Sequence, residues 1–352
     1  MLFSSCLACR MGSRFFAASD GSGGGGVELK EPDRWRLDVH HHILPPAYVD
    51  ALGAAAIGAP APNRAMPTWS PQASIDMMDQ LGIELAVTSI SAPGLLCETT
   101  DATRRLVMTC NDYAARLRTD HPGRFAMFAA LPLPDVDAGL AEIERAYDSL
   151  GAEGIGLFTN FDGLYLGDEK FRPILAELDR RKAVVYVHPT TPLCAPDLGI
   201  PASTIEFPFE TTRTITSLIY SGAFAAYPHI RFIFSHAGGA VPYLAERIAR
   251  LATTDRRFAS LGEEPRKSLS RLYFDTALSA NPTAMRALGD LVPSRQILFG
   301  TDFPFAPAST AIRSRDGLNA MRVPAAELRG IYRDNLLSLF PNLLDGPRPF
   351  TP

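Results

Sequence analysis

The stretch Asp38-Val39-His40-His41-His42 ends a short apolar run that begins at Trp35, which is the pattern of a β-strand finishing on histidines. The pattern returns in Val184-Val185-Tyr186-Val187-His188 and again in Phe232-Ile233-Phe234-Ser235-His236. A longer segment with the spacing of an amphipathic helix follows each run. Buried strands that alternate with such helices are typical of βα units around a parallel sheet.

Eight βα units can be counted after residue 33. We expect strands at 35–40, 84–90, 124–131, 154–158, 183–188, 231–236, 271–276 and 296–302. We expect helices around 71–81, 101–119, 137–150, 168–181, 209–226, 240–253, 282–290 and 309–319. Eight units in about 300 residues predict an α/β fold of the closed (β/α)8 type, and an open doubly wound sheet is the alternative.

The 352 residues, 46% of them hydrophobic, suit one large globular domain or two modest ones. We expect a barrel domain at 34–345 between a flexible N-terminal tail at 1–33 and a short C-terminal tail at 346–352. Residues 1–19 resemble an organelle transit peptide weakly and read better as an unstructured tail. Pro201 and Pro208 predict a long loop at 190–207 over the barrel mouth, where such loops often act as lids.

Composition excludes several classes of partner. A net charge of −4 and a pI of about 6.0 leave no basic excess for nucleic acid or for an anionic membrane. No apolar run reaches the length of about 18 residues that a membrane span needs. Five scattered cysteines fit reduced thiols better than a disulfide framework. We therefore expect a cytoplasmic protein. A homodimer is expected as well.

Histidine and aspartate side chains mark the ends of four expected strands. Alternation along the first strand places His40 and His42 on one face and turns His41 away. His188, His236 and Asp302 end the fifth, sixth and eighth strands. A lone strand-end histidine is usually a packing residue, but the ends of parallel strands meet at the rim where barrel enzymes build their active sites. The set therefore predicts a metal centre, whereas His121 and His229 are interpreted as structural.

These residues, in this order, resemble the amidohydrolase superfamily over about residues 36–340. The motifs Val187-His188-Pro189, Ser235-His236-Ala237-Gly238-Gly239 and Gly300-Thr301-Asp302-Phe303-Pro304-Phe305 resemble its aminocarboxymuconate semialdehyde decarboxylase branch. Within that branch, Thr159-Asn160-Phe161-Asp162-Gly163 with Tyr165-Leu166-Gly167-Asp168 is most similar to fungal 6-methylsalicylate decarboxylases. Gamma-resorcylate decarboxylases are similar but carry Glu in place of His40.

The resemblance implies one divalent metal per chain, held by His40, His42, His188 and Asp302, with His236 beside it. The fourth strand ends in Leu157-Phe158-Thr159-Asn160, which offers no carboxylate to bridge a second metal. Three nitrogens and one carboxylate suit Zn²⁺ and also tolerate Mn²⁺. These four ligands leave room for two substrate oxygens, which a fifth protein ligand would displace, so His236 is expected beside the metal. His236 or Asp302 is expected to deliver a proton to the substrate. No organic cofactor is implied.

The reaction implied is the nonoxidative decarboxylation of a small aromatic carboxylic acid, with 6-methylsalicylate giving 3-methylphenol (m-cresol) and CO2. A mononuclear amidohydrolase or lactonase would use the same ligands and is the alternative, and a noncatalytic metal-binding protein is disfavoured. Asp275 ends the seventh strand and is interpreted as a hydrogen-bond acceptor that orients a ligand histidine. Rim loops supply the candidate substrate-binding residues Arg64, Trp69, Phe158, Phe207 and Phe305, with Phe209 and Phe303 as further aromatic candidates.

Overall fold

A computed structural model describes residues 34–321 and 323–345, and the expected tails at 1–33 and 346–352 lie outside them. In the described residues eight parallel strands follow one another in the order β1-β2-β3-β4-β7-β8-β9-β10. These strands are β1 Arg36–His42, β2 Ile83–Ser89, β3 Phe125–Ala130, β4 Gly154–Phe158, β7 Val184–His188, β8 Arg231–Phe234, β9 Tyr273–Asp275 and β10 Ile297–Leu298. The (β/α)8 barrel is confirmed, and the doubly wound alternative is wrong.

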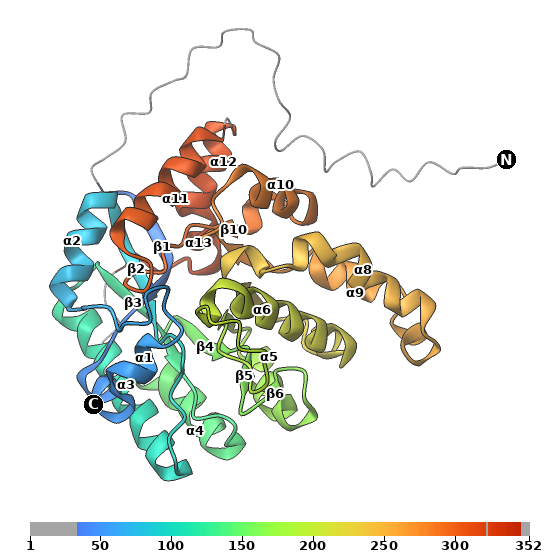
Figure 1. The fold of residues 1–352 in the computed structure, drawn as a ribbon, viewed down its shortest axis with the longest axis horizontal. Coiled ribbons are helices and arrows are strands. Elements are labelled where there is room, and N and C mark those ends of the chain that lie inside the picture. The colour runs from blue at the N-terminus through green and yellow to red at the C-terminus, as the bar shows by residue number, and fades with distance from the viewer. Residues whose placement is uncertain (1–33, 322, 346–352) are drawn as a thin grey trace, which may run out of the picture.

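Helices cover the outside of the barrel (Figure 1). Several begin at a side-chain cap: Ser70, Thr99 and Asp135 each accept a hydrogen bond from a backbone N–H of the first turn. The helices are α1 Pro46–Gly58, α2 Pro71–Leu81, α3 Thr100–Asp120, α4 Val136–Asp148, α5 Arg172–Arg180, α6 Ala202–Tyr220, α7 Ala223–Ala226, α8 Val241–Thr254, α9 Glu264–Leu269, α10 Pro282–Leu291, α11 Ala308–Ala320, α12 Ala325–Arg329 and α13 Asn335–Leu339.

The segment after β7 differs from its expectation. The long loop expected at 190–207 is shorter, because α6 begins at Ala202 and continues through Pro208. Proline removes a donor from a helix and so predicts a boundary, but α6 tolerates it here. The helix expected at 209–226 is divided, because Gly222 takes a positive φ of 75° between α6 and α7. The hairpin of β5 Asn160–Phe161 and β6 Leu164–Tyr165 was not expected either.

Apolar side chains fill the barrel interior and also the layer between strands and helices. The interior cluster includes Val39, Val87, Tyr186 and Ile233 from alternate positions of the strands. Residues 336–343 close its lower end, where Leu336, Leu339, Phe340 and Leu343 pack into the cluster. Side chains therefore fill the end of the barrel that residues 336–343 close. The opposite end, where the carboxyl ends of the strands lie, is left for a site.

Hydrogen bonds close the barrel between β1 and the segment after β10. Val39 N donates to Phe299 O over 3.0 Å, and Asp302 N donates to His40 O over 2.8 Å. The contact between β1 and the segment after β10 is called the seam here, and the fully buried carboxylate of Asp38 crosses it. It accepts from Thr301 N at 3.1 Å and from Thr301 Oγ1 at 2.6 Å, as well as from His40 N at 3.0 Å. The first and last strands are thus tied at the point where His40 and Asp302 emerge.

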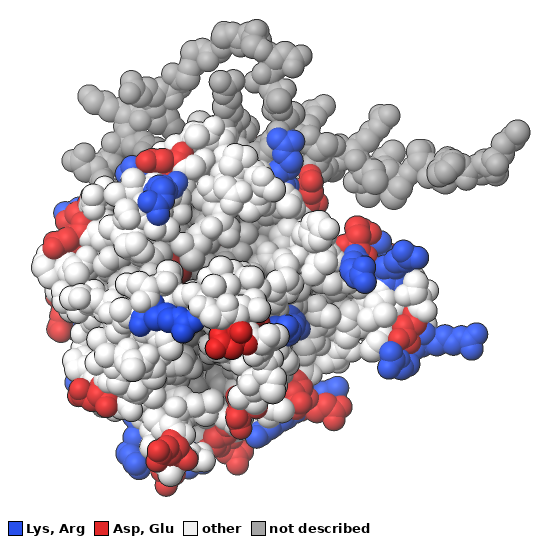
Figure 2. Space-filling view, in the orientation of Figure 1, with Lys and Arg blue, Asp and Glu red and all other residues white. Residues whose placement is uncertain are grey.

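The described surface agrees with the composition. On the face in Figure 2, acidic and basic side chains are mixed around the edge, and uncharged residues occupy most of the middle. No helix among the described residues has the length and apolar character needed to cross a membrane.

We predict that Thr301→Val lowers the free energy of unfolding of the metal-free protein by about 1–3 kcal/mol, because it leaves a buried carboxylate short of one donor. Thr253→Val is the matched control, since the Thr253 hydroxyl bonds a backbone carbonyl at an exposed helix end, and it should change stability by less than about 0.5 kcal/mol. Urea unfolding measures both. Equal stabilities for the two variants would contradict the role of the seam.

Candidate metal centre

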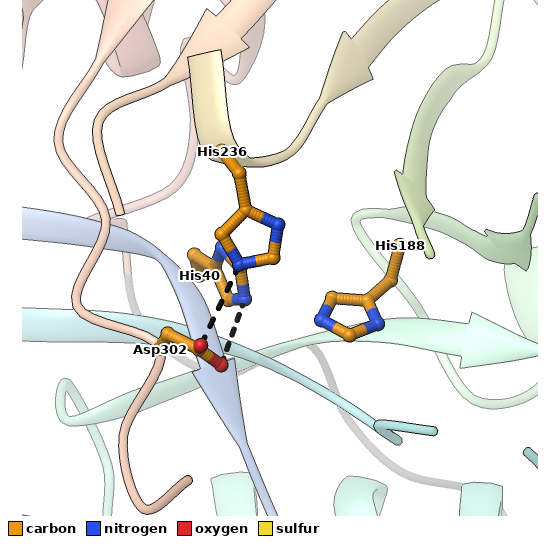
Figure 3. A group of neighbouring side chains, drawn as sticks. All are labelled: His40, His188, His236 and Asp302. Carbon is orange, nitrogen blue, oxygen red and sulfur yellow. Dashed lines mark ion pairs between the residues drawn. The ribbon is translucent and has the colours of Figure 1, made fainter. Parts of the chain in front are cut away.

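Four strand ends bring their side chains to one point. His40 lies in β1, His188 ends β7, His236 follows β8 and Asp302 follows β10. All four are buried, and their candidate ligand atoms lie within 4.8 Å of one another. Figure 3 shows the four side chains converging from different strands, with ion pairs from His40 and His236 to Asp302.

His42 stands at the edge of this group. Its Nε2 is 3.0 Å from His40 Nε2 and 3.2 Å from Asp302 Oδ1. The structure therefore brings together all five groups expected from the sequence. His236 belongs to the four-residue cluster of mutual ligand distances, and His42 does not. Which of these two histidines is a ligand stays a prediction.

Hydrogen bonds behind the histidines aim their Nε2 atoms at the centre. His40 Nδ1 lies 2.9 Å from Asp275 Oδ2, and His188 Nδ1 donates to Pro189 O over 2.8 Å. His42 Nδ1 faces Ser89, with its Oγ at 3.1 Å. Such partners fix the ring orientation of metal-binding histidines. The structure places Asp275 against His40 as expected, and Ser89 was missed, although a polar residue at the end of β2 is a signal of the same kind.

The donor set fits a divalent metal. His188 Nε2 and both ring nitrogens of His236 are buried and have no hydrogen-bond partner. Unpartnered buried polar atoms are costly, so native structures rarely hold them without a function. Imidazole nitrogens with one carboxylate are the ligands that Zn²⁺ takes and Mn²⁺ tolerates.

Burial and charge set the protonation of the metal-free site. Burial lowers the pKa of His42 to about 4 and that of His188 well below its usual value. Burial also opposes the charge on His40, but Asp275 and Asp302 outweigh it and raise the pKa of His40 to about 10. Burial would raise the pKa of Asp302, but His40 and the neighbouring imidazoles hold it well below its usual value. A proton on His40 therefore stands where a metal would bind.

Backbone strain is concentrated beside the cluster. His236, Ala237 and Asp302 all have a positive φ, of 54°, 54° and 61°. Non-glycine residues in this region are uncommon, and they persist where the surrounding structure holds them for function. With this backbone conformation, the side chains of His236 and Asp302 point from the loops after β8 and β10 into the metal-competent cluster.

His41 points away from the centre, on the opposite face of β1 from His40 and His42. Its Nε2 lies 2.8 Å from Ser74 Oγ on α2, and its Nδ1 lies 3.1 Å from Asp38 Oδ2. Trp69 shares this outer location, because its indole N–H donates to the same Ser74 hydroxyl over 2.9 Å. The candidate substrate residue Trp69 is thus held on the outer side of β1.

A cavity of about 380 Å³ opens above the cluster, with His188, His236 and Asp302 in its floor. Two candidate substrate residues line it: Phe207, whose ring meets His188 edge-on at 6.0 Å, and Phe305, which meets His42 at 5.7 Å. The rest of the lining is mainly apolar, with a few hydroxyls, and includes Pro60, Ala61, Ser91, Ala92, Thr204, Leu278, Ser279 and Thr310.

The other candidates lie outside this lining. Arg64 is exposed in a turn, where Arg64 N donates to Ala61 O, and that turn presents residues 60–62 to the cavity instead. Phe158 lines a neighbouring cavity of about 210 Å³. Phe209 is 42% exposed, and Phe303 packs on His41. The folding path of the rim loops decides these positions, and no local pattern reports it.

The sequence profile of the amidohydrolase family matches residues 37–341. The chain belongs to this family. Its amidohydrolase barrel, with the cluster at the strand ends, agrees with the resemblance found in the motifs.

Several relatives of this amidohydrolase are named as decarboxylases. The 6-methylsalicylic acid decarboxylase of Penicillium expansum is 37% identical over 316 residues, covering 88% of this chain and 97% of the relative. The gamma-resorcylate decarboxylase of Rhizobium radiobacter is 31% identical over 299 residues, covering 77% and 86%. A crystal structure of an amidohydrolase II superposes with a TM-score of 0.82 at 28% identity, covering 87% and 100%. With this family and these relatives, the chain is an enzyme of the carboxy-lyase class.

We predict that His40→Ala, His188→Ala and Asp302→Ala each lose most of the bound metal and keep the fold, because the barrel core is apolar. His41→Ala is the matched control, a buried histidine of the same strand that faces α2 and should keep its metal. Elemental analysis and circular dichroism of the purified variants check both points. Full metal occupancy in all four variants would remove the proposed centre.

We predict that binding of one Zn²⁺ near pH 7 releases about one proton, because His40 with a pKa of about 10 is protonated in the metal-free site and must lose that proton to become a ligand. The apparent metal affinity should fall about tenfold for each unit by which the pH is lowered below neutrality. Calorimetry in two buffers of different ionisation enthalpy counts the protons. A count of zero would mean that the metal does not displace a proton from His40.

Proposed function

We propose that this enzyme catalyses the metal-dependent, nonoxidative decarboxylation of 6-methylsalicylate to 3-methylphenol and CO2. The observation that carries the proposal is a cavity with apolar walls directly above a cluster of metal-competent side chains. The similarity to a 6-methylsalicylic acid decarboxylase along almost the whole of both chains supports the same substrate. We also propose Zn²⁺ as the resident metal and a homodimer as the assembly.

The charge of the cavity favours a substrate with a single carboxylate. The described residues that line it include no lysine and no arginine. A second carboxylate would therefore enter an apolar space without a positive partner, which is unfavourable. One carboxylate at the floor and a methyl group against Phe207, Phe305 or Leu278 match the lining.

The bound metal would supply positive charge to hold and polarise the carboxylate and the ortho hydroxyl. The residues then have to move one proton. The bond between the ring and the carboxylate carbon breaks, a C–H bond forms at the same ring carbon, and CO2 leaves. His236 and Asp302 both line the cavity floor, with His236 Nε2 3.5 Å from Asp302 Oδ2. This pair can carry the proton to the ring.

We predict that the metal-loaded enzyme releases CO2 and 3-methylphenol from 6-methylsalicylate. Salicylate, orsellinate and gamma-resorcylate are tested beside it. Product analysis also separates decarboxylation from hydrolysis, because a lactonase or amidohydrolase consumes water and releases no CO2. Turnover of a lactone or amide, with no CO2 from any of the four acids, would overturn the proposal.

We predict that His236→Ala keeps its metal but loses turnover by about 100-fold or more, the usual scale for a positioned proton-transfer group. The control is His229→Ala, because His229 pairs with Asp179 in an exposed position and should leave turnover unchanged. Metal analysis and initial rates are measured on the same preparations. Near-normal turnover in His236→Ala would refute the catalytic role, and loss of its metal would instead make His236 a ligand.

A further inference from the structure

Glu210 in α6 is a buried carboxylate that the proposed chemistry does not use. Its exposed fraction is 0%, and it is neither part of the metal cluster nor part of the cavity lining. A carboxylate removed from water is strongly unfavourable unless donors surround it. The groups that satisfy Glu210 therefore indicate what it does.

Two of these groups belong to the hairpin β5–β6. Asn160 Nδ2 donates to Glu210 Oε2 over 2.7 Å, and the Tyr165 hydroxyl donates to Glu210 Oε1 over 2.7 Å. Asn160 Oδ1 also accepts from Gly163 N at 3.2 Å, which closes the turn between the two strands. One carboxylate thus joins both strands of the hairpin to α6, and these residues are the motif that resembled 6-methylsalicylate decarboxylases.

The opposite side of α6 contacts the loop that carries His236. Thr212 Oγ1 accepts from Ala240 N at 3.0 Å and donates to Pro208 O over 2.8 Å. A Cβ placed on Gly239 would lie 2.1 Å from Pro208 O, so only glycine permits this approach. Figure 1 shows α6 between the hairpin and α8. The helix is therefore held from both sides.

The first turns of α6 form one wall of the cavity, through Ser203, Thr204, Phe207 and Pro208. Phe207 lies one helical turn before Glu210 and meets the His188 ring edge-on. Any shift of α6 against the hairpin would move this ring relative to the floor. The position of the wall thus depends on the bonds made by Glu210.

We propose that Glu210 is a positioning residue which, through Asn160 and Tyr165, fixes the Phe207 wall and thereby sets which ring substituents the cavity accepts. The inference rests on the proposed function for its substrates, but the contacts that carry it are independent of the chemistry. Glu210 acts through Phe207 and does not touch the reacting atoms.

The test compares Tyr165→Phe and Glu210→Gln with the control Arg213→Gln. Arg213 also pairs with Glu210 Oε1, at 2.9 Å, but it is half-exposed and lies on α6 itself. Its loss cuts no bond between the helix and the hairpin, and an exposed partner contributes little. Tyr165→Phe removes a single hydroxyl and keeps the ring.

Steady-state kinetics with 6-methylsalicylate and salicylate give the readout. Tyr165→Phe and Glu210→Gln should lower the preference for the methylated acid, as a ratio of kcat/KM values, by about threefold to tenfold, the scale of one lost hydrogen bond. The change should appear in KM, with kcat and metal content preserved, and Arg213→Gln should keep the wild-type ratio. An unchanged ratio in both test variants would overturn the proposal, and a loss of stability alone would assign Glu210 a structural role.

Hydrogen exchange separates failure of this inference from failure of the proposed function. The amides of residues 203–207 and of Phe209 should exchange faster in Tyr165→Phe than in Arg213→Gln, without any ligand. If the wild type decarboxylates neither acid, the proposed function fails and this exchange comparison still decides the inference. Equal exchange in the two variants would mean that the hydrogen bonds from Glu210 to the hairpin do not position the Phe207 wall.

Discussion

The buried carboxylate of Asp38 is the constraint on which the site depends. It joins β1 to the segment after β10 through two donors of Thr301, and it also accepts from the backbone N–H of His40 within β1. His40 and Asp302 stand on opposite sides of this seam, so the distance between them is set where the barrel closes. The same carboxylate accepts from His41, which orients the neighbouring ring away from the centre. One side chain therefore fixes both the closure of the fold and the direction of two adjacent histidines.

Regular periodicity explains what could be predicted from the sequence. The period of two along β1 placed His40 and His42 together, and the common direction of parallel strands brought His188, His236 and Asp302 to the same rim. Loop residues carry no such period. Trp69 turned outward because the Ser74 hydroxyl lies there, and Pro208 did not end α6. Both outcomes depend on tertiary contacts. The same is true of which histidine, His42 or His236, joins the four-residue cluster.

The walls and the floor of the cavity differ in charge. The described lining is free of lysine and arginine, while the floor gathers imidazoles around one ionised aspartate. In the metal-free site the raised pKa of His40 keeps a proton on its ring, whose Nε2 lies 3.0 Å from His42 Nε2 and 3.2 Å from Asp302 Oδ1. Metal and proton therefore compete for the same position, and an anionic acid finds its counter-charge only where the metal sits.

The seam between β1 and the end of β10 joins residues 263 positions apart in the chain. On a ribosome that adds about 5–20 residues per second, Asp38 waits roughly 13–50 s for Thr301 to be made. During that time the apolar interior side of β1 has no last strand beside it, and residues 336–343, which close the bottom of the barrel, come later still. The nascent chain is thus exposed to aggregation for most of its synthesis, and the metal centre, which includes Asp302, cannot be complete before most of the chain has been translated.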